Sequence, residues 1–321
     1  MNKIVLTRIA VLLSGLLFLF GCSRDSVNGP PVQPARSASQ MVQKATDQNN
    51  STTLAWMEHA NLQLAGKGLR IALEAVDFYT IGVGRPGARI HQQPFRWVPN
   101  DARRLADGDN ITYMFDESHG VTASGLTTSQ TESAIDAALS TWAGDPSMKK
   151  VTIVKRPYTG QDPTIVDGML GFGGIGNPFL ADIVDAGWYP RAFFDTVGGA
   201  GGGRGILGVT FTFIFIDGKG KPTDINGDNY LDEALSETYF NDTFGDASND
   251  RAGNPWVING PLPGIDAQTV ALHENGHALD LGHFGPPPIA VMNPVYGGIR
   301  QNPYPSDDAG LNALWGSWPN P

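Results

Sequence analysis

The chain has 321 residues, of which 41% are hydrophobic and 17% are charged, and its formal net charge is −10. This composition is typical of a globular protein with enough apolar residues for a sizeable core. The acidic balance excludes a basic nucleic-acid-binding protein, so we expect no nucleic-acid partner. The 40 glycines indicate many loops.

The first residues have the pattern of an export signal. Lys3 and Arg8 precede an apolar run over residues 9–20, which is too short for a confident membrane span. The run ends in Leu19-Phe20-Gly21-Cys22, which resembles a bacterial lipobox, and Cys22 is the only cysteine. We therefore expect a signal peptide over residues 1–21 and a lipid on Cys22 that anchors the exported protein to the membrane of the cell envelope. The alternative is ordinary signal cleavage and a freely secreted protein.

Two segments separate this signal from the main domain. Residues 22–50 are rich in Ser, Pro, Gln and Asn, which predicts a flexible tether. Residues 51–100 are expected to form an accessory subdomain or a pro-segment. Within them, Leu54–Ala65 has helical spacing of apolar residues, whereas Leu69–Thr80 fits either a strand or a helix.

Residues 101–321 are expected to form one domain of the α+β class, with a twisted mixed sheet. Ser129–Trp142 has the apolar spacing of an amphipathic helix. Strands are expected at Ile111–Phe115, Lys150–Lys155, Ala181–Val184, Ile206–Ile216 and Ser236–Asn241. The glycine-rich stretches 171–176 and 198–205 are expected to be loops, since neither has the context of a nucleotide-binding motif.

Oxygen ligands recur at alternate positions between Asp224 and Glu233. Asp224, Asn226 and Asp228 match positions 1, 3 and 5 of a calcium loop. The remaining candidates are the Tyr230 carbonyl at position 7, Asp232 at position 9, and Glu233 in place of the missing final Glu. We expect a structural calcium ion here; a solvated acidic turn is the alternative.

The stretch His273-Glu274-Asn275-Gly276-His277-Ala278-Leu279-Asp280-Leu281-Gly282-His283 points to zinc. Two His residues four positions apart lie on one face of a helix, here expected from Ala267 to about Leu279 with Asp266 as its N-cap, and both can reach one ion. Glu274 is placed to act as the general base toward a zinc-activated water.

The third ligand must come from beyond these helical turns. No Glu follows Glu274, which excludes the peptidase class whose third ligand is a downstream Glu. His283 is the better candidate, although Asp307 or Asp308 stays open. For His283 to reach the ion the helix must break first, and Asp280 and Gly282 both tolerate left-handed backbone.

Three motifs in order carry a family resemblance. Residues His273 to His283 resemble the metzincin signature, with Asp280 where that family has Gly. The stretch Ala290-Val291-Met292-Asn293-Pro294-Val295-Tyr296 resembles the Met-turn of matrixins, and residues 306–316 resemble their C-terminal helix. The resemblance implies a metzincin-type catalytic domain, with His283 as third ligand, Met292 below the zinc and Tyr296 in the specificity-pocket wall. It also implies that Ser236–Asn241 is an edge strand that pairs with an extended peptide.

The function expected from these features is a zinc-dependent endopeptidase acting on a peptide or protein substrate. One alternative is a surface binding module that keeps zinc but has lost turnover, and another is a hydrolase of a non-peptide amide. The matrixin latency device requires a pro-segment Cys, and this chain has none to supply it.

Overall fold

The computed structural model describes residues 51–82, 93–105 and 108–320. The predicted signal peptide, tether and lipidated Cys22 lie outside these residues. No helix in the described part is both long and apolar enough to cross a bilayer.

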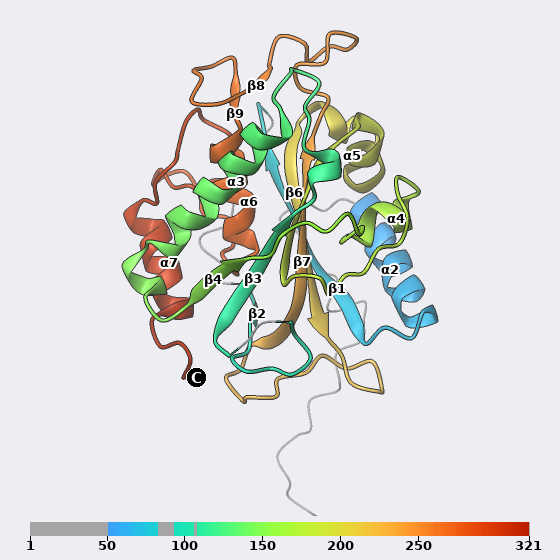
Figure 1. The fold of residues 1–321 in the computed structure, drawn as a ribbon, viewed down its shortest axis with the longest axis vertical. Helices are drawn as coiled ribbons and strands as arrows, with labels where there is room; N and C mark the ends of the chain where they lie inside the picture. The colour runs from blue at the N-terminus through green and yellow to red at the C-terminus, as the bar shows by residue number, and fades with distance from the viewer. Residues whose placement is uncertain (1–50, 83–92, 106–107, 321) are drawn as a thin grey trace, which may run out of the picture. The chain divides into compact units, whose positions relative to one another are not determined.

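A mixed sheet of seven strands forms the centre of the described chain (Figure 1). Its strand order is β1-β6-β7-β5-β3-β4, and β2 pairs with the start of β7. The β1–β6 and β6–β7 pairs are antiparallel, and the others are parallel. The strands are β1 (Ile71–Thr80), β2 (Phe95–Arg96), β3 (Asn110–Phe115), β4 (Thr152–Lys155), β5 (Ile183–Tyr189), β6 (Ile206–Phe215) and β7 (Leu231–Asn241).

Helices cover both faces of this sheet. In Figure 1, α3, α6 and α7 lie on one side, and α2, α4 and α5 lie on the other. Each side has its own hydrophobic core, so β6 is buried along its whole length. The helices are α2 (Ser51–Gly66), α3 (Thr128–Ala143), α4 (Val166–Leu170), α5 (Arg191–Gly198), α6 (Ala267–His277) and α7 (Pro305–Trp315). Short 3-10 helices span Glu117–His119, Pro146–Met148 and Gly202–Arg204, and β8 (Trp256–Val257) pairs with β9 (Ile265–Asp266).

This architecture confirms the predicted α+β class with a mixed sheet. The ambiguous stretch Leu69–Thr80 contains strand β1, Ile71–Thr80, in which eight of the ten residues are buried. Helix α3 begins with a capping box, in which the side chains of Thr127 and Gln130 each accept a hydrogen bond from the backbone N–H of the other residue. The glycine-rich stretch 171–176 is a loop, whereas Gly202–Arg204 forms a helical turn inside the second such stretch.

The prediction that Ser236–Asn241 is an edge strand was wrong. These residues belong to β7, which lies between β6 and β5. The polar side chains of this segment are buried and hydrogen-bonded. Glu237, for example, accepts from the backbone N–H groups of Ile165 and Val166. The edges of the described sheet are β1 and β4.

Residues 51–80 are built into this sheet. Strand β1 pairs with β6 along nearly its whole length, and α2 packs on one face of the same strands. The Asn61 side chain closes two hydrogen bonds with the Leu73 backbone, and the Thr53 hydroxyl donates to the carbonyl of Val197. The segment that the sequence left as accessory subdomain or pro-segment therefore forms an edge of the main sheet.

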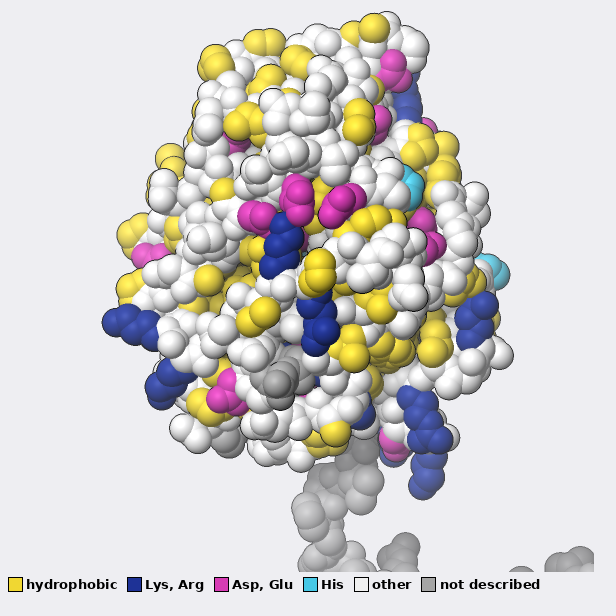
Figure 2. Space-filling model, in the orientation of Figure 1, with side chains coloured by type: hydrophobic (Ala, Val, Ile, Leu, Met, Phe, Trp, Pro, Cys, Tyr) yellow, Lys and Arg dark blue, Asp and Glu magenta, His cyan; other side chains and the backbone are white. Residues whose placement is uncertain are grey.

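Charged side chains on the face in Figure 2 are mixed in sign. Acidic side chains gather near the middle of that face beside Lys or Arg. Lys155 of β4 pairs with Glu132 and Asp136 of α3, each at 2.7 Å and partly exposed. Such surface pairs contribute little to stability, on the order of 0–1 kcal/mol.

Candidate metal centre

Helix α6 carries the first two His residues and the Glu of the motif. Its N-cap is Asp266, whose carboxylate accepts from the Thr269 N–H, as predicted from the sequence. His273, Glu274 and His277 are all fully buried. The helix ends at His277, two residues earlier than predicted, and the chain then turns back toward His283.

Asp280 makes this turn possible. Its φ is +68°, in the left-handed region that Asp tolerates better than most side chains. The Asp280 N–H bonds to the His277 carbonyl, and the Leu281 N–H bonds to the carbonyl of Gly276. The residue that departs from the family pattern thus adopts the backbone conformation for which the pattern uses Gly.

The three His side chains converge on one point. The Nε2 atoms of His273 and His277 are 3.1 Å apart, and the Nε2 of His283 lies 3.3 Å and 3.2 Å from them. Three ligands of a tetrahedral zinc with bonds of about 2.0–2.1 Å would stand about 3.3 Å apart. The triangle therefore fits a zinc ion with one position left open. Within the described residues, these three His are the group of His, Cys, Asp or Glu side chains that could hold a metal ion.

Hydrogen bonds fix the orientation of two of these rings. Nδ1 of His273 lies 2.8 Å from the Val291 carbonyl, and Nδ1 of His277 lies 2.7 Å from the Leu281 carbonyl. A carbonyl accepts only, so each Nδ1 carries the proton and each Nε2 lone pair is free for a metal. Burial lowers the pKa of His277 to about 4, and burial with the neighbouring His residues holds the pKa of His273 and His283 well below its ordinary value. The rings are therefore neutral near pH 7, as a metal ligand must be.

Glu274 lies against β6. Thr210 of β6 donates its hydroxyl to Glu274 Oε2 at 2.7 Å, and a side chain at Gly208 would collide with the Glu274 carboxyl. Oε1 is buried without a hydrogen-bond partner among the described residues. Burial raises the pKa of Glu274 well above its ordinary value, and the Thr210 hydrogen bond opposes this shift. Such a carboxyl can take up and return a proton.

Met292 packs against α6, the helix that carries the first two His residues. Its side chain is buried against Gly276, where any side chain would collide with its sulfur. Asp307 of α7 holds the turn, because its carboxylate accepts from the N–H groups of Val291 and Met292. The Asp307 carboxylate is thus hydrogen-bonded to the Met-turn, and Asp307 is not a member of the three-His group. Asp308 is not a member of that group either.

The Tyr296 side chain contacts the N-terminal end of α6. Its hydroxyl accepts from the Asp266 N–H at 2.9 Å, so it joins the segment after Met292 to the N-terminus of the helix.

Sequence reasoning missed three residues around this centre: Tyr79, Gly208 and Thr210. The Tyr79 ring stacks on His273, with centroids 3.8 Å apart and planes 8° from parallel. All three lie more than 60 positions before the motif, on strands without a recognisable catalytic or metal-binding motif. Their proximity follows only from the pairing of β1 with β6 and the packing of α6 on β6.

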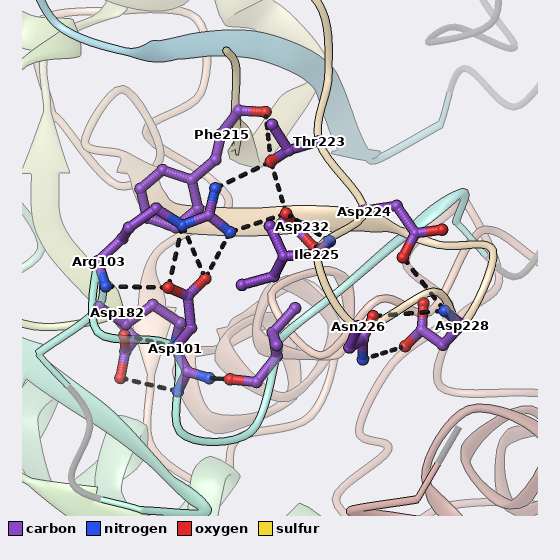
Figure 3. Close-up of polar contacts among 12 residues, drawn as sticks. Asp101, Arg103, Asp182, Phe215, Thr223, Asp224, Ile225, Asn226, Asp228 and Asp232 are labelled. Carbon is purple, nitrogen blue, oxygen red and sulfur yellow. Dashed lines mark hydrogen bonds and ion pairs between the residues drawn. The ribbon is translucent and has the colours of Figure 1, made fainter.

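Among the described residues, the predicted calcium ligands form no group of side chains that could hold a metal ion. Figure 3 shows Asp232 beside Arg103, and Asn226 beside Asp228. Asp224 accepts from backbone N–H groups of its own loop, at Gly227, Asp228 and Asn229. Asp228 pairs with Arg96, and Tyr230 lies under the same guanidinium group. Asn226 donates its amide to Asp228.

The last two predicted calcium ligands are also engaged elsewhere. Asp232 pairs with Arg103, which also pairs with Asp101 (Figure 3). Glu233 is fully buried next to Asp280 and accepts from the Ser236 hydroxyl. Arg96 and Arg103 thus supply positive charge of the kind that a calcium ion would bring to this loop.

Comparisons with known proteins agree with this geometry. Residues 210–316 match the family model described as matrixin. The human protein matrix metalloproteinase-19 is 44% identical to this chain over 59 residues, which are 18% of this chain and 11% of the human protein. The chain therefore carries a matrixin-like metallopeptidase region, which includes β7, α6, the Met-turn and α7. Strand β1 lies outside the matched residues.

Proposed function

We propose that this chain, whose residues 210–316 are matrixin-like, is a zinc-dependent endopeptidase. His273, His277 and His283 would hold the zinc, and Glu274 would act as general base and acid. The substrate would be a peptide or protein. The observation that carries the proposal is the triangle of three Nε2 atoms beside the buried Glu274 carboxyl on the same helix.

Each residue has a separate task in this proposal. A bound zinc would supply a more acidic water and polarise the scissile carbonyl. Glu274 would take the proton of the attacking water and return it to the leaving amine. Thr210 would keep the Glu274 carboxylate oriented, and the Val291 and Leu281 carbonyls would keep the two helical His rings in their tautomers.

Cleavage of a peptide library by the purified chain tests this proposal. We expect internal cleavage that stops when a chelator removes the metal and returns when zinc is restored. Activity that is unaffected by the chelator would contradict it. The cleavage sites would also define the specificity.

A binding module without turnover is the second candidate. It is favoured by one observation, the Tyr79 ring stacked on His273 with all of its side chain buried. This candidate predicts bound zinc and no cleavage in any variant. Cleavage by a chain in which Tyr79 is replaced by Ala would eliminate it.

We also propose that the Asp224–Glu233 loop binds calcium, and this proposal does not depend on the zinc site. Binding would require Asp228 to leave Arg96 and Asp232 to leave Arg103, because both carboxylates are engaged in these pairs. We expect millimolar calcium to raise the melting temperature of the zinc-loaded protein, and to have no such effect on an Asp224→Ala variant. An unchanged melting temperature in the wild type would show that the arginine pairs hold the loop without an ion.

Lipid anchoring through Cys22 is also proposed, on the sequence pattern of residues 1–22 alone. We expect the protein to partition with the membrane of the bacterial cell envelope and to incorporate a labelled fatty acid. A Cys22→Ser variant would lose both. Label incorporation by that variant, or none by the wild type, would favour free secretion.

A further inference from the structure

Strand β1 forms the edge of the sheet that lies nearest the metal centre. It pairs antiparallel with β6, and Tyr79 lies opposite Gly208 in this register. Gly208 is the residue whose missing side chain leaves room for the Glu274 carboxyl. The end of β1 therefore lies next to the candidate base.

The residues that end β1 are hydrogen-bonded on two sides. The Ile81 N–H donates to the carbonyl of Gly205. On the other side, the Thr80 N–H donates to the Pro294 carbonyl at 3.2 Å, and the Thr80 carbonyl accepts from the Tyr296 N–H at 2.7 Å. Thr80 and Val295 form a parallel bridge. An extended segment of the chain itself thus lies between β6 and the segment that follows Met292.

The Tyr79 side chain lies against one member of the His triangle. Its ring lies flat on His273 and edge-on to Tyr296, with centroids 3.8 Å and 6.0 Å away. The side chain is 0% exposed, as are His273 and Glu274. Its hydroxyl has no hydrogen-bond partner among the described residues, so the ring is held by stacking and burial.

We propose that the end of β1, Tyr79–Ile81, is a built-in inhibitory segment that occupies the position of an extended substrate and shields the metal centre. The arrangement described above is then a latent state. A peptide that binds by strand addition needs free backbone groups on a sheet edge, and β1 already uses those of β6. This inference rests on the proposed peptidase function for the nature of the ligand that is held back.

Release would require local separation of these contacts, including the hydrogen bond from the Thr80 hydroxyl to the Pro294 carbonyl. Three backbone hydrogen bonds, from Thr80, Ile81 and Tyr296, hold the last residues of β1 outside the β1–β6 pairing. Strand ends open at a lower free-energy cost than the whole fold. A substrate would therefore compete with Tyr79–Ile81, and its apparent affinity would fall by the fraction of time that the segment is closed.

Replacing Tyr79 tests the segment directly. Tyr79→Ala removes the stacked ring, whereas Tyr79→Phe keeps the ring and loses only an unpartnered hydroxyl. We expect Tyr79→Ala to speed zinc loss to a chelator and peptide cleavage by about fivefold to tenfold, because a buried aromatic stack is lost. Tyr79→Phe should match the wild type in both. If Tyr79→Ala releases zinc at the wild-type rate, or if Tyr79→Phe abolishes cleavage, the inhibitory role is overturned.

A reversible clamp provides a second test that does not depend on the stability of these variants. Phe78 and Val209 face each other across β1 and β6, on the core opposite the metal centre. In a Cys22→Ser background, Phe78→Cys with Val209→Cys would lock the end of β1 when oxidised. We expect the oxidised form to lose zinc and cleave peptides about tenfold more slowly than the same protein after reduction. Equal rates would overturn the inference.

These readouts separate the two proposals. Zinc loss to the chelator reports access to the metal centre whether or not the protein cleaves peptides. Faster zinc loss in Tyr79→Ala without any cleavage would support the inhibitory segment and contradict the peptidase. Peptide cleavage by Tyr79→Ala with zinc loss at the wild-type rate would support the peptidase and contradict the inhibitory segment.

Discussion

The hydroxyl of Thr210 donates to Oε2 of Glu274 at 2.7 Å, across the contact between β6 and α6. The same hydroxyl also lies 3.1 Å from the Glu274 carbonyl, so it fixes the side chain relative to its own backbone. This side-chain hydrogen bond orients the Glu274 carboxyl, and a backbone hydrogen bond of Tyr79 contributes as well.

Thr210→Val should therefore weaken the base without disturbing the zinc ligands. A hydrogen bond to a charged group is worth about 1.5–3 kcal/mol, so we expect kcat/KM for peptide cleavage to fall by about tenfold or more. Because the bond lowers the pKa of Glu274, its loss should move the acidic limb of the kcat/KM profile to higher pH. Thr210→Ser keeps the hydroxyl and is the matched control. A profile for Thr210→Val that overlies the wild type would show that Thr210 has no such role.

Gly276 is predicted to be required for the Met-turn. A methyl group there would collide with the Met292 side chain and approach Trp142. We expect Gly276→Ala to lower the free energy of unfolding by about 1–3 kcal/mol, the usual cost of overpacking a core, and to weaken zinc binding. Gly253→Ala is the control, because a Cβ at Gly253 meets nothing within 4 Å. Denaturant unfolding of both variants checks this, and equal stabilities would contradict it.

Asp280 should make stability depend on pH. Burial raises its pKa to about 7 from an ordinary value of 3.8, and Arg96 and Arg104 only partly offset this. The folded protein then binds a proton that the unfolded chain has released, so the contribution of Asp280 to stability is present below about pH 4 and is lost as the pH rises to about 7. Asn tolerates the same left-handed backbone and does not titrate.

Comparison of the wild type with Asp280→Asn isolates this contribution. We expect the variant to gain stability relative to the wild type between about pH 4 and about pH 7, as measured by urea unfolding at several pH values. A difference that stays constant over this range would show that the Asp280 carboxyl does not change its charge there. Glu233→Gln should shift the pH dependence in the wild-type background, because the two buried carboxyls are neighbours.

The sequence predicted the convergence of the three His residues because the parts of the motif are local. His273 and His277 are one helical turn apart, and the break before His283 needed a residue that tolerates left-handed backbone, which Asp280 supplies. Met292 and the C-terminal helix follow within 40 positions. Such short-range geometry depends on helix periodicity and turn chemistry, both of which are readable from residue types.

Long-range pairing was not predictable in the same way. Nothing in the pattern of Leu69–Thr80 indicated that this stretch would add to the sheet beside β6, and the segment Ser236–Asn241 was wrongly placed at an edge. Polar residues in β7 do not mark an exposed edge, because Glu237 is buried with its own hydrogen-bond donors. The contact between Tyr79 and His273 joins residues 194 positions apart and has no local signature.

The acidic loop shows a different limit of the sequence pattern. The spacing of Asp224, Asn226 and Asp228 suits a calcium loop. Spacing does not show whether an arginine from another segment forms an ion pair with these carboxylates. Arg96 lies 132 positions before Asp228 and pairs with it in the folded chain. Competition between a cation and a guanidinium group depends on tertiary structure.

The central claim is tested most directly by Glu274→Gln, assayed for bound zinc and for peptide cleavage in the same preparation. Gln has nearly the shape of Glu but cannot accept the proton of the attacking water. We predict about one zinc ion per chain, as in the wild type, and a loss of kcat of at least about a hundredfold. Undiminished cleavage by zinc-loaded Glu274→Gln would contradict the assignment of Glu274 as the base and, with it, the proposed mechanism.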